Sequence, residues 1–152
     1  MSQNTSTDEA IVPCWAFFCT DKDTSVAIDS GNEQEAITNL LANNKQAIFL
    51  LDRTEKMVTE WLKNAITGSQ LRKLFNAVAA LKREADNDRE LHRIRIQLIY
   101  IAVRQNNEKA FNFASFVRKI LNDINGDKQK IETFKDFMEA VLSYHKYHHN
   151  KK

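Results

Sequence analysis

The chain has 152 residues, of which 43% are hydrophobic and 28% are charged, and its formal net charge is +2. This length favours a single domain with a substantial core, and no apolar run is long enough to cross a bilayer. The first ten residues carry two acids and no cation, unlike a signal peptide. We therefore expect a cytoplasmic protein that makes no membrane contact.

Charge is unevenly distributed along the chain. Residues 1–60 hold 4 Lys or Arg against 10 Asp or Glu, whereas residues 61–119 hold 12 against 5. A basic segment of this kind favours a polyanionic partner. For any single cation the simpler alternative is that it is only solvated.

Glycine and proline are scarce, which bears on the fold class. The chain has 3 Gly and 1 Pro, whereas strand-rich chains need many turns that recruit both residues. We predict an all-α compact bundle of about five helices. Residues 32–152 are expected to form a single helical bundle domain, and residues 1–31 a weakly ordered acidic arm. Cys14 and Cys19 in this arm are expected to be free thiols, with a disulfide as the alternative.

The first two predicted helices follow from apolar spacing and cap signals. One begins near Glu33 and continues into the forties. The second begins after Asp52, which forms a D-x-x-E capping box with Glu55. Its expected core residues lie at helical spacing: they are Met57, Val58, Trp61 and Leu62.

The third predicted helix spans about residues 69–84 and carries two misplaced cations. It begins at a T-x-x-Q capping box formed by Thr67 and Gln70. Arg72 and Lys73 follow in the first turn, where the helix dipole disfavours cations. A phosphate binds at the same place through free N–H groups, so these cations suit a phosphodiester backbone. The expected buried face consists of Leu71, Leu74, Phe75, Val78 and Leu81.

The segment LHRIRIQLIYIAV at residues 91–103 is ambiguous, because RIRIQL alternates as a strand does. A lone strand would leave its backbone groups unpaired, so we predict a helix. Its apolar residues lie on more than one side, which predicts a central, largely enclosed helix. One side holds Leu91, Ile94, Leu98 and Ile101, and another holds Ile96, Ile99 and Val103. The remaining polar stripe consists of Arg93, Gln97, Tyr100 and Arg104.

Two further helices complete the predicted bundle. Asn107 is expected to cap the first of them, Gly126 to end it, and Asp127 to cap the last one. The expected core residues are Phe113, Phe116, Val117, Ile120, Leu121, Ile131, Phe134, Phe137, Met138, Val141 and Leu142. The terminal HKYHH is expected to be a frayed basic tail, with a metal site as the alternative. Its histidines are His145, His148 and His149.

Catalytic signals are poor throughout the sequence. There is no Gly-rich phosphate loop, no H-E-x-x-H and no G-x-S-x-G. We therefore expect no enzyme, no catalytic residue, no cofactor, no metal and no small-molecule substrate. The cations predicted to bind RNA backbone are Arg72, Lys73, Arg93, Arg104, Arg83 and Lys63.

Three motifs, in this order, resemble those of a known family. TGSQLRKLFNAVAALKRE resembles its T-x-S-Q-[I/L]-R-K helix start, and QLIYIAVRQ its following Y-x-x-x-R helix. FKDFMEAVLSYHK resembles its C-terminal F-x-x-F-x-E-A-x-x-x-Y-H-K signature. The family is the small helical subunit of type III-A CRISPR–Cas effector complexes, the Csm type. The resemblance covers roughly residues 54–147.

The resemblance implies an all-α subunit with no active site of its own, working in antiviral defence. The partners it implies are the guide RNA and target RNA, contacted along the backbone without sequence specificity, other subunits of the complex, and further copies of this chain. On the matching positions, the implied RNA contacts are Arg72, Lys73 and Arg104. The signature residues expected to secure the last helix or a subunit contact are Glu139, Tyr144 and His145.

Two other functions remain open from the sequence. A helix-turn-helix DNA regulator would use residues 54–64 and 69–84, with Gln70 and Lys73 directed at base edges. A purely protein-binding helical adaptor would leave the cations solvated.

Overall fold

The structure is a computed structural model that describes residues 13–18, 33–41, 53–82, 87–124 and 127–150. Residues 53–57 are α-helical and continue into a π-helix. The elements in chain order are the 3-10 helix η2 (Cys14–Phe18), α2 (Glu33–Leu41), the π-helix η3 (Val58–Leu62), α4 (Gly68–Ala79), α5 (Asp88–Gln105), α6 (Glu108–Ile124) and α7 (Lys128–Asn150). The all-α prediction is confirmed. Besides the short 3-10 helix η2, the described residues contain six helices, because residues 53–62 form one continuous helix, so the expected number of about five was slightly low.

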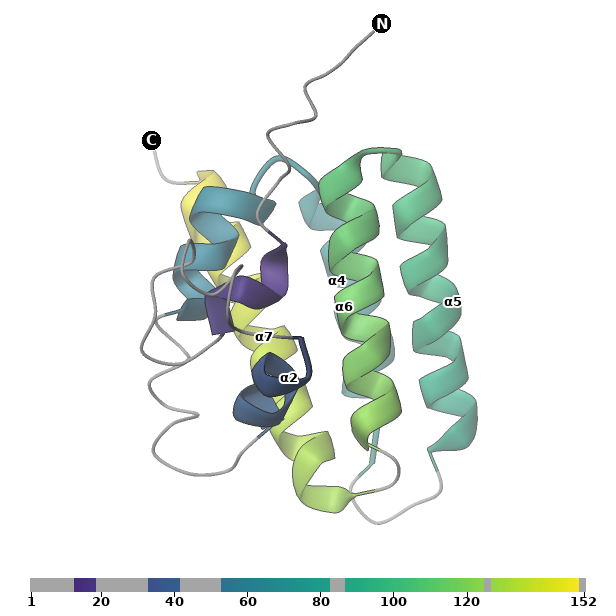
Figure 1. Cartoon of the computed structure of the whole chain (residues 1–152). Coiled ribbons are helices and arrows are strands. Elements are labelled where there is room, and N and C mark those ends of the chain that lie inside the picture. The colour runs from purple at the N-terminus through teal and green to yellow at the C-terminus, as the bar shows by residue number, and fades with distance from the viewer. Residues whose placement is uncertain (1–12, 19–32, 42–52, 83–86, 125–126, 151–152) are drawn as a thin grey trace, which may run out of the picture.

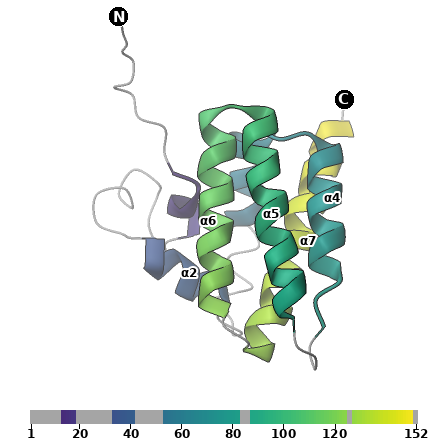
Figure 2. The same cartoon turned by 90° about the vertical axis from the view of Figure 1, so that its right-hand side faces the viewer.

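The long helices pack as neighbours in a layered bundle (Figure 1). Helix α5 lies between α4 and α6, and α4 also packs against α7. On the other side of the bundle, α2 contacts both α6 and α7, and η2 contacts α2 and α6. Figure 2 shows α6, α5 and α4 on one face of the molecule. Helix α5 therefore has α4 on one flank and α6 on the other.

The core is apolar and rich in phenylalanine. Phe18 stacks on Phe116 with ring centroids 5.9 Å apart and meets Phe137 edge-on at 5.5 Å. Such aromatic pairs add to the stability that burial alone provides. The core residues expected on α6 and α7 are confirmed as buried, except that Leu142 is only partly buried.

Residues 14–18 of the predicted arm contribute to this core. Cys14 is fully buried and free. Burial, followed by the nearby Glu33 carboxylate, raises the pKa of the Cys14 thiol, which keeps it protonated and unreactive. Cys19 and the rest of residues 1–31 lie outside the described residues. The division into an arm and a bundle domain therefore stays a prediction.

Three of the predicted caps lie within the described residues. The Gln70 N–H donates to Thr67 Oγ1 at 3.1 Å, so Thr67 caps α4. The reciprocal half of this capping box does not form, because Gln70 Oε1 is buried with no hydrogen-bond partner. The other two caps are confirmed by Ala110 N–H to Asn107 Oδ1 at 2.8 Å and by Gln129 N–H to Asp127 Oδ1 at 2.9 Å. The expected cap Asp52 and stop Gly126 lie outside the described residues.

The helix predicted over residues 91–103 is confirmed as part of α5, but its expected enclosure is wrong. Ile96 is 53% exposed, Ile99 47% and Val103 64%. Among the described elements, α5 packs mainly against α4 and α6, and these apolar residues on its outer side are exposed. Within the described residues, no helix has both the length and the apolar character needed to span a bilayer.

Candidate nucleic-acid interface

The start of α4 presents two exposed cations. Arg72 and Lys73 both lie on the solvent side, and the first turn of α4 contains no acid that would balance the helix dipole. Neither cation forms an ion pair with any residue that the structure describes. Their charge is therefore available to an external anion.

The orientation of α5 places its polar stripe toward α4. Arg95 Nη2 donates to Asn122 Oδ1 of α6 at 3.1 Å, which marks the edge of α5 that faces α6. At about 100° per residue, Arg93, Gln97 and Arg104 lie about 160–180° around the helix from Arg95. They therefore occupy the opposite edge, beside α4.

Helix α4 turns one of its cations toward this stripe. A Cβ added at Gly68 would lie 3.9 Å from His145 on α7, so this edge of α4 faces α7. Lys73 lies about 140° around the helix from Gly68, toward α5, while Arg72 points outward. We call the polar residues on the outer side of α4 and α5 the basic seam; all are exposed except the half-buried Gln97, and Arg72 lies farther from α5 than Lys73 does. They are Arg72, Lys73, Arg93, Gln97, Tyr100 and Arg104.

Tyr100 lies between Arg93 and Arg104 along α5. The side chain of Tyr100 is 48% exposed. Arg104 Nη1 donates to its hydroxyl at 3.4 Å, a long hydrogen bond that leaves most of the guanidinium free. A guanidinium with free N–H groups is well suited to a phosphate oxygen.

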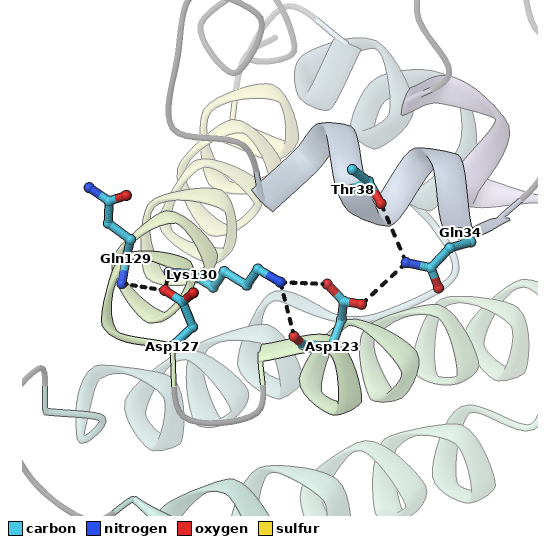
Figure 3. Close-up of polar contacts among 6 residues, drawn as sticks. All are labelled: Gln34, Thr38, Asp123, Asp127, Gln129 and Lys130. Atoms are coloured by element: carbon cyan, nitrogen blue, oxygen red, sulfur yellow. Dashed lines mark hydrogen bonds and ion pairs between the residues drawn. The ribbon is translucent and has the colours of Figure 1, made fainter.

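The cations on the opposite side of the molecule are neutralised. Lys119 pairs with Glu33 of α2 at 2.7 Å. Lys130 pairs with Asp123 at 3.2 Å, and Asp123 also accepts from Gln34 (Figure 3). These lysines are held by carboxylates and are less available to a polyanion than those of the basic seam.

An acidic stripe on α7 disfavours binding of a polyanion on the side of α4 that faces α7. Glu132, Asp136 and Glu139 lie within about 60° of one another around α7. Burial, followed by the like charges of Glu132 and Glu139, raises the pKa of Asp136. Lys135 on the same helix donates to the Leu81 carbonyl at the end of α4, at 2.8 Å. The negative field beside α4 on its α7 side therefore favours a phosphate path along the α5 side.

Of the remaining two predicted RNA-binding cations, Lys63 does not join the basic seam. Lys63 is half-buried and lines an open pocket of about 340 Å³ together with Trp61 and Lys109. Glu60 and Glu108 also line this pocket, so its charges are balanced. Arg83 lies outside the described residues.

His145 is part of the core rather than of a frayed tail, which corrects the prediction for the C-terminal histidines. It is only 2% exposed, and α7 continues beyond it to Asn150. His145 Nε2 lies 3.1 Å from the Lys63 carbonyl oxygen and 3.0 Å from that of Ile66. Because both partners are acceptors, Nε2 carries the proton and donates. His145 therefore fastens α7 to the turn that precedes α4.

His148 adds a second attachment between α7 and the same region. Its Nε2 lies 2.7 Å from Glu55 Oε2, whereas His149 is exposed and stacks on His145 with ring centroids 6.0 Å apart. In the described part of the chain, no three His, Cys, Asp or Glu side chains are grouped as metal ligands. The two anchored histidines have structural contacts instead.

The buried position of His145 predicts a pH-dependent stability. Burial is the main cause that lowers the pKa of His145 below its ordinary value of 6.5, against the two carbonyl hydrogen bonds, which raise it. At a pH between the lowered pKa of His145 in the folded chain and its ordinary pKa in the unfolded chain, the unfolded chain therefore binds more protons than the folded one. We expect the free energy of unfolding to fall as the pH drops through 6.5 and to level off below the folded pKa.

This decline is measured by urea denaturation at a series of pH values above the range in which carboxylates titrate. A His145→Gln variant should lose the decline, whereas a His149→Gln control should keep it. An unchanged slope in His145→Gln would contradict the assignment.

Base reading by α4 is not compatible with the structure. Gln70, which a helix-turn-helix would direct at base edges, is 8% exposed and part of the buried face. Lys73 is exposed, but the outward residues Ala79 and Ala80 are too short to reach a groove. The prediction of Gln70 as a base-reading residue is therefore wrong.

Three structural features were missed by reasoning from sequence patterns, although the motif resemblance had His145 securing the last helix or a subunit contact. The contacts of His145 and Lys135 join residues that are 54 to 82 positions apart in the sequence, so no local pattern indicates them. The π-helix η3 has no recognisable motif. The exposed apolar side of α5 did have a signal, since its sequence is apolar on more sides than one buried face can use.

The family comparison agrees with the resemblance of the three motifs. A family model described as Csm2 Type III-A matches residues 44–151. Neither the curated proteins nor the solved structures include a match to the chain.

Proposed function

The chain belongs to the Csm2 family of type III-A subunits, and from this premise we propose that its basic seam holds RNA by the phosphate backbone. Membership makes it a subunit of a type III-A CRISPR effector complex, with other Csm subunits as partners. Our proposal adds that the subunit is non-catalytic, binds guide or target RNA without sequence specificity, and braces neighbouring subunits, including copies of itself.

The observation that carries this proposal is the set of exposed cations at the α4–α5 junction. Arg72, Lys73 and Arg93 have no ion pair with a described residue, and Arg104 has only the long bond to Tyr100. Phosphate contacts of this kind fix the position of a nucleic acid without reading its bases. The start of α4 adds the favourable end of a helix dipole.

The chemistry of the seam supports binding rather than catalysis. Its side chains are Arg, Lys, Gln and Tyr, which neutralise or hydrogen-bond phosphates. None of them forms the nucleophile and base pair that covalent catalysis needs. The neighbouring outward residues Ala79 and Ala80 are exposed and short, which leaves room for a backbone to approach the helix.

The proposal predicts sequence-independent, salt-sensitive binding of single-stranded RNA. Two unrelated RNAs of equal length should bind the purified chain with the same Kd, and log K should fall linearly with log salt concentration. Fluorescence anisotropy over a salt series measures both. Binding that survives high salt, or a marked preference for one DNA duplex, would contradict the proposal and favour the regulator alternative.

A further inference from the structure

An exposed apolar strip runs along the hairpin of α5 and α6. It consists of Ile96, Ile99 and Val103 on α5 and Phe111 on α6, with exposed fractions of 53%, 47%, 64% and 47%. Isolated apolar residues on a surface are ordinary, but adjacent ones mark an interaction site. The basic seam does not use these four side chains.

The hairpin geometry makes the strip continuous. Ile99 and Val103 are one turn apart on α5, and both lie within about 80° of Arg95, on the side toward α6. Phe111 lies about 20° from Asn122 around α6, and Asn122 is the residue that Arg95 contacts. The two helices are joined by a tight turn at Asn106, which has a φ of 50°. Val103 and Phe111 therefore lie at the same end of the hairpin.

Arginines surround the strip and define the charge of its partner. The exposed arginines near it are Arg89 and Arg118, and Arg93 and Arg104 of the basic seam border it on the α4 side. The acids at its two ends are Asp88 and Glu108. Arg118 lies about 20° from Phe111 around α6, on the same edge. The rim is therefore positive, and a complementary surface has carboxylates around an apolar centre.

The positive rim favours one of the three possible ligands of the strip over the other two. A second copy that used the same face would bring the arginines of the two copies together, which costs energy. RNA would gain from the arginines but nothing from three β-branched and aliphatic side chains. An acidic protein surface with an apolar centre satisfies both parts of the strip.

We infer that the apolar strip is a docking surface for a different protein chain, whose contact surface is apolar at its centre and acidic at its rim. The inference rests on the proposed function only in that the other subunits of the effector complex are the partners to test. The strip and the basic seam would then lie side by side on the exposed side of α5, with Arg93 and Arg104 at their border.

The test is incorporation into the effector complex assembled by co-expression with all other subunits, purified through a tag on one of those subunits. Ile96→Glu with Val103→Glu should lower the amount of this chain retained by about tenfold, because two central contacts become charged and face acids. Ile96→Lys with Val103→Lys should lower it less, since the new charge opposes an acidic rim. All changes are at exposed positions, and circular dichroism verifies the fold.

A matched control is Tyr147→Glu, which charges another exposed large side chain, 59% exposed, on α7. It should leave retention unchanged. Equal retention of all variants would overturn the inference, and so would an equal loss with Glu and with Lys. Loss of self-association by the strip variants in sedimentation would assign the strip to a second copy instead.

The inference about the strip and the proposed RNA-binding function of the basic seam can be contradicted independently of each other. The strip variants should lose much less affinity for single-stranded RNA than Arg72→Glu with Lys73→Glu, because neither Ile96 nor Val103 is a residue of the basic seam. If they lose RNA affinity as strongly as seam variants do, the strip belongs to the RNA site and the inference is wrong. If the seam variants also keep full RNA affinity, the proposed function fails, while the inference stands or falls on retention.

Discussion

Charge reversal at the start of α4 is expected to weaken binding of single-stranded RNA by about 100-fold. Arg72→Glu with Lys73→Glu removes two charge-assisted phosphate contacts, each worth roughly 1.5 kcal/mol, and about 3 kcal/mol corresponds to this factor. Both side chains are exposed and neither is in the core, so the fold should persist. Anisotropy titrations at low salt measure the change.

Replacing the same two residues with alanine tests whether they contact phosphates directly, rather than how much affinity they contribute. Arg72→Ala with Lys73→Ala removes two phosphate contacts, so the slope of log K against log salt should become shallower by about 1.4. The matched control is Lys119→Ala with Lys130→Ala. It makes the same change in net charge, but at lysines already paired with Glu33 and Asp123. Equal slopes for both double variants would show that only net charge matters.

Truncation of His145 is expected to destabilise the fold by roughly 3 kcal/mol. His145→Ala removes a 2% exposed ring and leaves the carbonyl groups of Lys63 and Ile66 without this donor. An unpaired buried polar group costs about 1–3 kcal/mol, and the cavity adds to it. Urea denaturation gives the difference in the free energy of unfolding.

The neighbouring histidine provides the control for this prediction. His149→Ala removes an exposed ring and should change the free energy of unfolding by less than about 0.5 kcal/mol. His145→Gln should recover part of the loss, because its amide N–H can donate to one of the two carbonyls. Similar losses for His145→Ala and His149→Ala would show that the buried hydrogen bonds contribute little.

The local features of the fold could be predicted from the sequence. Apolar spacing identified the buried faces of α4, α6 and α7, and short cap motifs identified Thr67, Asn107 and Asp127. These signals work because helix periodicity and capping depend on residues within one or two turns. The exposure of Arg72 and Lys73 followed from the same periodicity.

The features that depend on distant segments could not be predicted in this way. The apolar residues of α5 were assigned to an enclosed helix, because the sequence does not indicate how many neighbours a helix has. The HKYHH segment by itself was assigned to a frayed tail, since the partners of His145 at Lys63 and Ile66 lie 82 and 79 residues away. Only the motif resemblance indicated that His145 secures the last helix or a subunit contact. Lys63 was grouped with the other cations on charge alone, and the fold separates it from them.

Helix α7 holds α4 at both ends, which has a mechanical consequence. His145 fixes the turn before α4 through two carbonyls, and Lys135 fixes its far end through the Leu81 carbonyl. With both ends tied, α4 cannot slide or tilt without carrying α7 along. A displacement of the start of α4 is therefore transmitted to α7, and we expect the two helices to move together as one rigid unit.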